Sequence, residues 1–441
     1  MLSSCLDTDE VTEFELGKNC QIHEFSLSSD SVPGLSQVKF TIDQLTGRIF
    51  NMDSMPFGTK VEKVVCKVKT AGAFAVTGIE VTPEAYKDST YYMKGLTDSI
   101  DFSAPVKFVV HAYDGVTTKV YNAQINIHQV QPDTMLWKMY VNPMLGISVK
   151  EQKVIARTYE KAERYFMYVK PAEANKPYAL YHAPVAEPKN WKQVSLTGLP
   201  ADSLLLSQLT AFNQKLFVPS LSGALYQSTD GLAWSKVENT PFVKSVLGSV
   251  AKGAKQTSVL ATIVEKEGVL SFYAMDGENE WIAGDPVSDD FPVSGFGSIE
   301  YNAMFYHYLS VSAGRSFKGQ VLGSTWSTMN GLNWSMMSDN TFPKREGAIV
   351  FSYDEKMFLL GGVDGSDKAL KDIYQSIDYG VNWSLADSML ILPPDYAARG
   401  FSSVQVDKEN YVNIFGGKTN AKANDLNQLW RGRINRLIPK E

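Results

Sequence analysis

The chain has 441 residues, of which 44% are hydrophobic, so it is long enough for several folded cores and too apolar for general disorder. Its 42 basic and 48 acidic side chains leave a formal net charge of −6, which argues against a generic nucleic-acid binder. The counts of Gly (32), Tyr (21), Phe (22) and Trp (8) are typical of an all-β protein with many turns. No apolar run reaches the roughly 18 residues that a membrane-spanning helix needs.

Cys5 ends the run Leu2-Ser3-Ser4-Cys5, and an acidic stretch follows it. This run resembles the lipobox of bacterial lipoproteins, in which the cysteine thiol carries the lipid. An acidic stretch after that cysteine is similar to the export signal of Bacteroides-type surface lipoproteins. The resemblance implies an exported lipoprotein of the outer membrane or cell surface, attached through Cys5 only, with residues 1–18 as an acidic tether. The alternative is a free cysteine in a disordered leader.

Residues 19–131 carry short segments of alternating apolar and polar residues, separated by turn residues such as Pro33-Gly34 and Asp114-Gly115. This pattern predicts a small antiparallel β-sandwich. The stretch 41–59 resembles the N-terminal immunoglobulin-like module of Bacteroidetes surface lipoproteins. Cys66 lies in a strand-like run and is interpreted as a small buried apolar residue, while a Cys20–Cys66 disulfide is left open.

Internal repeats begin after the extended segment at 129–133. Tryptophans recur at positions 191, 234, 281, 334, 383 and 430, close to the period of roughly 40–50 residues expected for four-stranded propeller blades. Two of them, Trp234 and Trp383, end a Ser-x-Asp turn with a nearby glycine, and Trp281 and Trp334 end weaker copies of it. The turn residues are Ser228, Asp230, Gly231 and Trp234; Asp276 and Trp281; Asn330, Gly331 and Trp334; and Ser376, Asp378, Gly380 and Trp383.

These turns resemble the Asp-box of sialidase-like propellers. Two later segments end in Gly-Gly, at 361–362 and 416–417, and each follows an arginine, as in kelch blades. The resemblance implies a six-bladed kelch/Asp-box-like β-propeller over residues 132–441, in which residues 134–140 complete the last blade. Seven blades are the alternative if residues 133–165 form an extra unit.

The Asp-box residues are interpreted as structural. The Asp carboxylate accepts turn amides, the glycine adopts positive φ, and the Trp packs over the turn. The alternative is a calcium or ligand site at the turn. The five histidines show no metal-ligand spacing, so we expect no metal site and no cofactor.

Candidate ligand-binding residues come from the segments expected to face the propeller channel. Arginine recognises carboxylates in a planar fork, carboxylate pairs can cleave glycosidic bonds, and tyrosine rings stack on sugars. The structural alternative is that the arginines hold neighbouring strands together through carboxylates such as Glu346, and that the aromatic ring lies in the core. The candidate residues are Arg345, Arg399, Glu300, Glu346 and Tyr301.

We therefore expect an all-β protein with a small N-terminal sandwich and a propeller, monomeric and bound to the membrane only by lipid. The favoured function is non-catalytic binding of a glycan or a surface protein on one propeller face. The alternative is a glycoside hydrolase or lyase that uses carboxylates at the channel.

Overall fold

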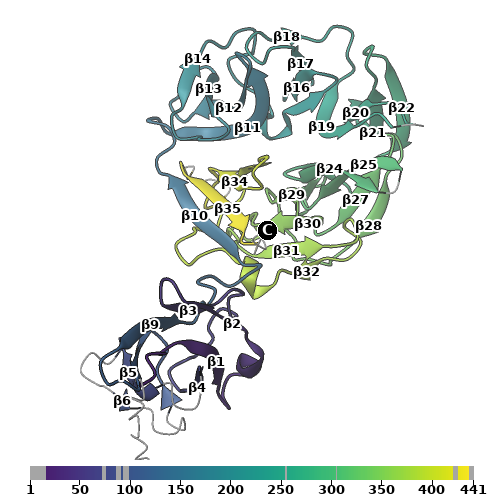
Figure 1. The fold of residues 1–441 in the computed structure, drawn as a ribbon. Helices are drawn as coiled ribbons and strands as arrows, with labels where there is room; N and C mark the ends of the chain where they lie inside the picture. The colour runs from purple at the N-terminus through teal and green to yellow at the C-terminus, as the bar shows by residue number, and fades with distance from the viewer. Residues whose placement is uncertain are drawn as a thin grey trace, which may run out of the picture. The chain divides into compact units, whose positions relative to one another are not determined.

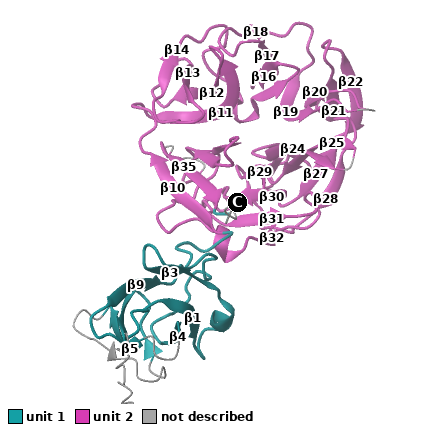
Figure 2. Cartoon of the chain, in the orientation of Figure 1, with its two compact units in different colours: residues 1–133, 435–441 teal, residues 134–434 magenta. Residues whose placement is uncertain are grey.

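The computed structural model describes residues 16–71, 76–85, 91–92, 99–253, 256–303, 305–420 and 426–436. The chain forms two compact units (Figure 2). Unit 1 comprises residues 1–133 and 435–441, and unit 2 comprises residues 134–434. Cys5 and the predicted tether up to residue 15 lie outside the described residues. Within the described ranges, no helix has the length and apolar character needed to span a membrane.

Unit 1 contains two sheets, in the orders β1-β4-β7 and β2-β3-β9-β8-β5-β6. The pairs are antiparallel except for β3 and β9, which run parallel. The strands are β1 (Ile22–Ser28), β2 (Phe40–Asp43), β3 (Arg48–Asn51), β4 (Val64–Thr70), β5 (Val76–Pro83), β6 (Tyr91–Tyr92), β7 (Ser99–Ile100), β8 (Val106–Ala112) and β9 (Thr118–Gln124), and the 3-10 helix η1 (Leu35–Gln37) follows β1.

One apolar core fills unit 1. Leu27 and Cys66 from the first sheet pack in the same cluster as Ile49, Val81 and Phe108 from the second. The inward residues alternate with exposed ones along β1, β4 and β8, as the period of a strand requires. Both Cys20 and Cys66 are buried and free, so the disulfide that the sequence left open is not formed.

Unit 2 is built from four-stranded antiparallel sheets whose strands follow one another in the chain, arranged around a centre (Figure 1). The first three sheets are β11 (Val149–Tyr159), β12 (Ala162–Pro171), β13 (Ala179–Pro184) and β14 (Lys192–Val194); β15 (Thr210–Phe212), β16 (Lys215–Pro219), β17 (Leu225–Ser228) and β18 (Ser235–Lys236); and β19 (Val243–Val250), β20 (Val259–Lys266), β21 (Val269–Met275) and β22 (Trp281–Pro286).

The next two sheets are β24 (Gly297–Ala303), β25 (Tyr306–Ser312), β27 (Thr325–Thr328) and β28 (Ser335–Ser338); and β29 (Ile349–Tyr353), β30 (Lys356–Leu360), β31 (Ile373–Ser376) and β32 (Ser384–Leu385). Two short strands, β23 (Pro292–Ser294) and β26 (Arg315–Ser316), pair with each other. In the chain, β23 precedes β24, and β26 lies between β25 and β27. Two further 3-10 helices, η2 (Leu206–Gln208) and η3 (Ser388–Leu390), occur in linkers.

The last sheet combines both ends of unit 2. Its order is β10-β35-β34-β33, made of β10 (Met135–Val141), β33 (Ser403–Val406), β34 (Val412–Phe415) and β35 (Leu429–Ile434). This confirms that the segment predicted at 134–140 supplies the final strand. The first strands β15, β19, β24, β29 and β33 contact one another in turn. β33 contacts β11, and β11 contacts the helix η2, which directly precedes β15, so the ring closes. The fold is all-β, with an N-terminal β domain and a propeller of several four-stranded blades.

Two hydrogen bonds seal this ring at its inner edge. The Val154 amide of β11 donates to Ser403 Oγ at 3.0 Å, and Gln405 Nε2 of β33 donates to the Val154 carbonyl at 3.1 Å. Because both partners of Val154 lie about 250 residues away in the chain, only the closed ring can supply these hydrogen bonds to its backbone amide and carbonyl. The seal also forms part of the wall of the central cavity.

Candidate functional site

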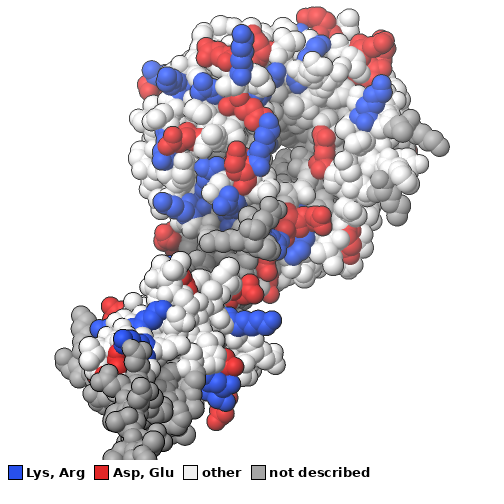
Figure 3. Space-filling view, in the orientation of Figure 1, with Lys and Arg blue, Asp and Glu red and all other residues white. Residues whose placement is uncertain are grey.

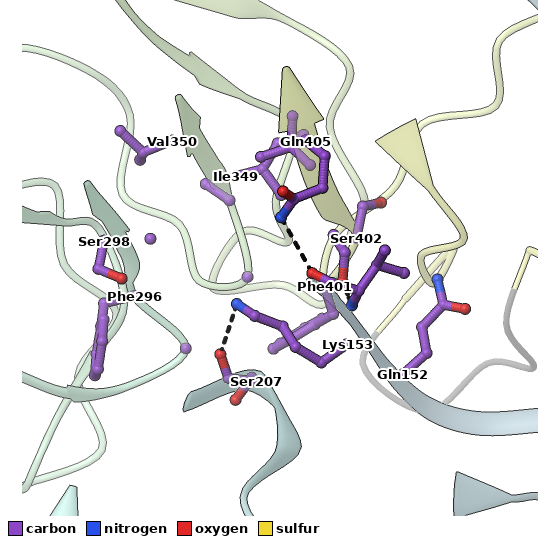
Figure 4. Close-up of a pocket in the computed structure, with 17 residues that line it drawn as sticks. Gln152, Lys153, Ser207, Phe296, Ser298, Ile349, Val350, Phe401, Ser402 and Gln405 are labelled. Carbon is purple, nitrogen blue, oxygen red and sulfur yellow. Dashed lines mark hydrogen bonds between the residues drawn. The ribbon is translucent and has the colours of Figure 1, made fainter. Parts of the chain in front are cut away.

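A cavity of about 200 Å³ lies at the centre of unit 2 (Figure 4). The first strands β11, β24, β29 and β33, the linkers before three of them and the helix η2 supply its wall, through residues 152–154, 207, 295–298, 347–350 and 401–405. A propeller channel is the place where ligands meet several blades at once, so this cavity is the first candidate for a site.

A second cavity, of about 600 Å³, adjoins the first, and the two share Gln152, Ser207, Gly295 and Phe401. We call it the mouth. Linkers that enter the first strands and turns that follow the second strands line it, so it opens on one face of the ring. Its charged residues are Lys150, Glu151, Lys170, Asp202, Glu346 and Lys418. Over the visible face of unit 2, basic and acidic side chains are interspersed (Figure 3).

The Asp-box turns lie on the other face. Each joins the third strand of a sheet to the fourth, whereas the mouth is lined by turns between second and third strands. Because neighbouring strands run antiparallel, these two kinds of turn lie at opposite ends of the blade. An Asp-box residue therefore cannot contribute to the mouth.

The Asp-box turns are closed by their own hydrogen bonds. Asp230 Oδ1 accepts the amides of Leu232 and Ala233 at 2.7 and 2.9 Å, and Ser228 Oγ accepts the Gly231 amide. Burial acts to raise the pKa of Asp230, but the donated amides outweigh it and hold the pKa below its usual value. Asp378 and Asn330 accept turn amides in the same way, and Asp276 accepts those of Glu278 and Glu280.

Arg345 is fully buried, with 0% of its surface exposed. Its guanidinium binds the Asp372 carboxylate with both terminal nitrogens, at 2.6 and 3.0 Å, and donates to the carbonyls of Gly361 and Pro343. The sequence suggested Glu346 as a partner for this arginine, but the partner is Asp372, which directly precedes β31. Arg345 therefore ties the linker before β29 to the second and third strands of its own sheet.

Arg399 repeats this arrangement in the last sheet and is 1% exposed. It donates to the carbonyls of Ala397 and Gly416 and to Gln428 Oε1, each at 2.9–3.0 Å, and lies 4.2 Å from the centre of the Tyr396 ring. Burial lowers its pKa. Both arginines thus have internal partners and almost no surface for a ligand, as in the structural alternative. A ligand-binding role for them stays a prediction.

Glu346 lines the mouth, and its carboxylate is paired with Arg315. The Arg315 guanidinium binds both carboxylate oxygens, with Nε at 2.9 Å from Oε2. Arginine forks of this kind fix a carboxylate in one orientation. Glu346 can therefore accept a hydrogen bond from a ligand at the mouth, while its charge is already paired.

Glu300 and Tyr301 lie on β24 but are not among the residues that line the two cavities. Ser249 Oγ donates to Glu300, and packing around the carboxyl raises its pKa. Tyr301 stands in a stack of three rings, at 5.2 Å from Tyr308 and 5.0 Å from Tyr379, and burial raises its pKa. Since Tyr379 belongs to an Asp-box turn, this stack faces the end opposite the mouth. The five candidate residues are thus not one cluster.

Two residues that sequence reasoning missed are Gln152 and Lys153. Lys153 Nζ lies in the central cavity and donates to the Ser207 carbonyl at 3.0 Å (Figure 4). Gln152 Nε2 is buried and finds no hydrogen-bond partner among the described residues. The only signal in the sequence was a polar run on the first strand of the first blade. Within the described residues, no group of three or more His, Cys, Asp and Glu side chains is placed to hold a metal ion.

Comparison with known proteins places the chain in a family. The family described as "DUF6242 beta propeller domain" matches residues 131–440, and "Domain of unknown function (DUF6242) N-terminal domain" matches residues 14–125. A solved structure titled "Structure of YjhT" is 10% identical, with a TM-score of 0.47, and the match covers 65% of this chain and 96% of that chain. No curated protein matches. The chain belongs to the DUF6242 family.

Proposed function

We propose that this member of the DUF6242 family is a non-catalytic binding protein that holds a glycan or protein ligand at the mouth of its propeller. The observation that carries the proposal is the pair of adjoining cavities. The mouth, at about 600 Å³, lies within the roughly 300–1,000 Å³ typical of ligand sites, and it continues into the channel. Apolar groups from Tyr178 and Leu221 stand there beside charged groups of both signs.

The proposal includes the setting of the protein. We place it at the outer membrane or cell surface, exported and anchored by a lipid on Cys5, and acting as a monomer. An immunoglobulin-like unit 1 and a six-bladed ring in unit 2 are part of the same picture. The lipobox-like run supports the anchor, and the four-stranded sheets with a shared closing strand support the ring.

The ligand is placed at the mouth and not on Arg345 or Arg399. A buried guanidinium with three or more internal acceptors can contact a ligand only if the surrounding strands separate. Mouth residues, by contrast, include Leu221, whose surface is 69% exposed on the turn between β16 and β17. Exposed apolar side chains beside a concave site are common anchors for ligands.

A glycan-array screen of the soluble protein beginning after Cys5 tests the proposal. Leu221→Arg places a long charged chain in the mouth and should abolish binding of any ligand found. Leu385→Arg is the matched control, because Leu385 is 64% exposed on β32, the outermost strand of another sheet. Binding that survives Leu221→Arg, or that fails equally in both variants, would contradict the placement.

The alternative function is a glycoside hydrolase or lyase. Glu300 favours it, because a carboxyl with a raised pKa can act as a general acid. A second carboxylate is also needed, and Glu346, the other candidate, is paired with Arg315. Turnover of chromogenic glycosides that is lost in Glu300→Gln would favour the enzyme over the binding protein.

A further inference from the structure

Lys153 is the charged residue of the central cavity. It lies on β11, half-buried, and its side chain extends across the cavity toward Ser207 (Figure 4). Its ammonium carries three N–H donors, and the Ser207 carbonyl accepts one of them. Two donors are left facing the cavity.

No carboxylate lines this cavity in the described part of the chain, and Lys153 forms no ion pair there. Lys170, at the mouth, is by contrast a lysine whose ammonium has both hydrogen-bond acceptors and a carboxylate nearby. Its buried Nζ donates to the carbonyls of Lys176 and Ala201 and lies 3.6 Å from Asp202. Lys153 is half-buried and has no such charged partner, so its ammonium is available to pair with an anion in the cavity.

The charge is present at neutral pH. Burial lowers the pKa of Lys153 to about 8, so roughly nine-tenths of the molecules carry the ammonium at pH 7. The residues of β24, β29 and β33 that line the cavity are uncharged. Among the described residues, the charged groups that line the adjoining mouth are Lys150, Glu151, Lys170, Asp202, Glu346 and Lys418.

The other walls of the cavity can hold polar ligand groups. Ser298 presents an exposed hydroxyl opposite Lys153. The cavity, at about 200 Å³, is below the size of most complete ligand sites. It suits one acidic group or ring, with the rest of a ligand in the mouth.

We propose that the central cavity binds the carboxylate of a small acidic ligand, with Lys153 as the cation that receives it. The inference rests on the proposed function and assigns a chemical class to its ligand. Two sources share this chemistry, a free carboxylic acid and an acidic sugar. Acetate and glucuronate represent them, and glucose is the neutral control.

Calorimetric titration of the full chain with each probe, at up to tens of millimolar, tests the inference. Acetate or glucuronate should bind at pH 7 and glucose should not. Lys153→Met should weaken binding at least tenfold. Lys192→Met is the matched control, because Lys192 is an exposed lysine on β14, the outermost strand of the same sheet, and lines neither cavity; it should change the affinity less than threefold.

The pH profile separates a direct role from a structural one. If only the ammonium form binds, raising the pH from 7 to 9 passes through the pKa and should weaken binding about tenfold in the wild type. Lys153→Arg keeps its charge over this range, so it should bind with little dependence on pH.

The outcomes are distinct. Binding of acetate alone assigns the site to free acids, and binding of glucuronate alone assigns it to acidic sugars. Equal binding of glucose and glucuronate, affinity unchanged in Lys153→Met, or no binding of either acid overturns the inference. The proposed function fails separately, through the Leu221→Arg test. A ligand lost in that variant and kept in Lys153→Met leaves the binding function standing without the carboxylate site.

Discussion

The Asp372→Asn variant tests the interpretation of the buried arginines as structural. In the wild type, Asp372 receives two hydrogen bonds from Arg345, which has no exposed surface. Asparagine keeps the shape of the side chain and one acceptor oxygen, but it removes the negative charge and one acceptor. The last sheet shows that a neutral amide is tolerated at this place, because Gln428 accepts from Arg399 there.

The expected cost follows from the kind of hydrogen bond. A bond to a charged partner stabilises by roughly 1.5–3 kcal/mol and a neutral one by roughly 0.5–1.5 kcal/mol. The Asp372 side chain is 30% exposed, so solvent screens part of the interaction. We therefore expect a loss of about 1–2 kcal/mol, which lowers the melting temperature by about 2–6 °C in a domain of this size.

Tryptophan fluorescence is the assay, because every one of the 8 tryptophans lies within unit 2 and reports its unfolding alone. Asp290→Asn is the matched control. Asp290 is exposed and its carboxylate has no hydrogen bond or ion pair among the described residues. A melting temperature of Asp372→Asn equal to that of the control would refute the structural role of the Arg345 fork. Loss of ligand binding at an unchanged melting temperature would restore the ligand-binding interpretation.

Three further predictions concern other parts of the chain. Asp378→Asn should cost about 1 kcal/mol at pH 7. Burial acts to raise the pKa of Asp378, but donated hydrogen bonds lower it overall. This stabilisation is therefore present above the ordinary pKa near 4 and is lost as the pH falls through the lowered value. The melting temperatures of both proteins should converge at pH values below that lowered pKa, and a constant difference would contradict the argument. In a Cys5→Ser background, Cys20 and Cys66 should react with a thiol reagent only on unfolding, because both are buried and burial raises the pKa of the Cys66 thiol. Two thiols that react fast in the native protein, or none that reacts after unfolding, would contradict this prediction. Gly231→Ala should destabilise unit 2 by about 1–3 kcal/mol, because φ is 78° and a Cβ would stand 2.8 Å from the Tyr168 hydroxyl; an unchanged melting temperature would show that this turn relaxes freely.

Local patterns in the sequence determined the architecture. Alternating strands and tryptophans such as Trp234 and Trp383, spaced by one blade, predicted four-stranded repeats, because each blade needs the same turn closed in the same way. The closing strand at 134–140 was predicted because the last repeat lacked one, and β10 fills that place. These features depend on contacts within one repeat or on counting repeats.

The site depended on information that no single segment contains. Arg345 and Arg399 were recognised by their position in the repeat, but only packing showed that Asp372 and Gln428 take up their hydrogen bonds and leave little surface. Lys153 carries no motif. Its surroundings come from walls supplied by segments up to about 250 residues away, and none of the described residues that line the cavity is a carboxylate. Burial and the lack of a partner are properties of the assembled ring, so tertiary structure alone decided them.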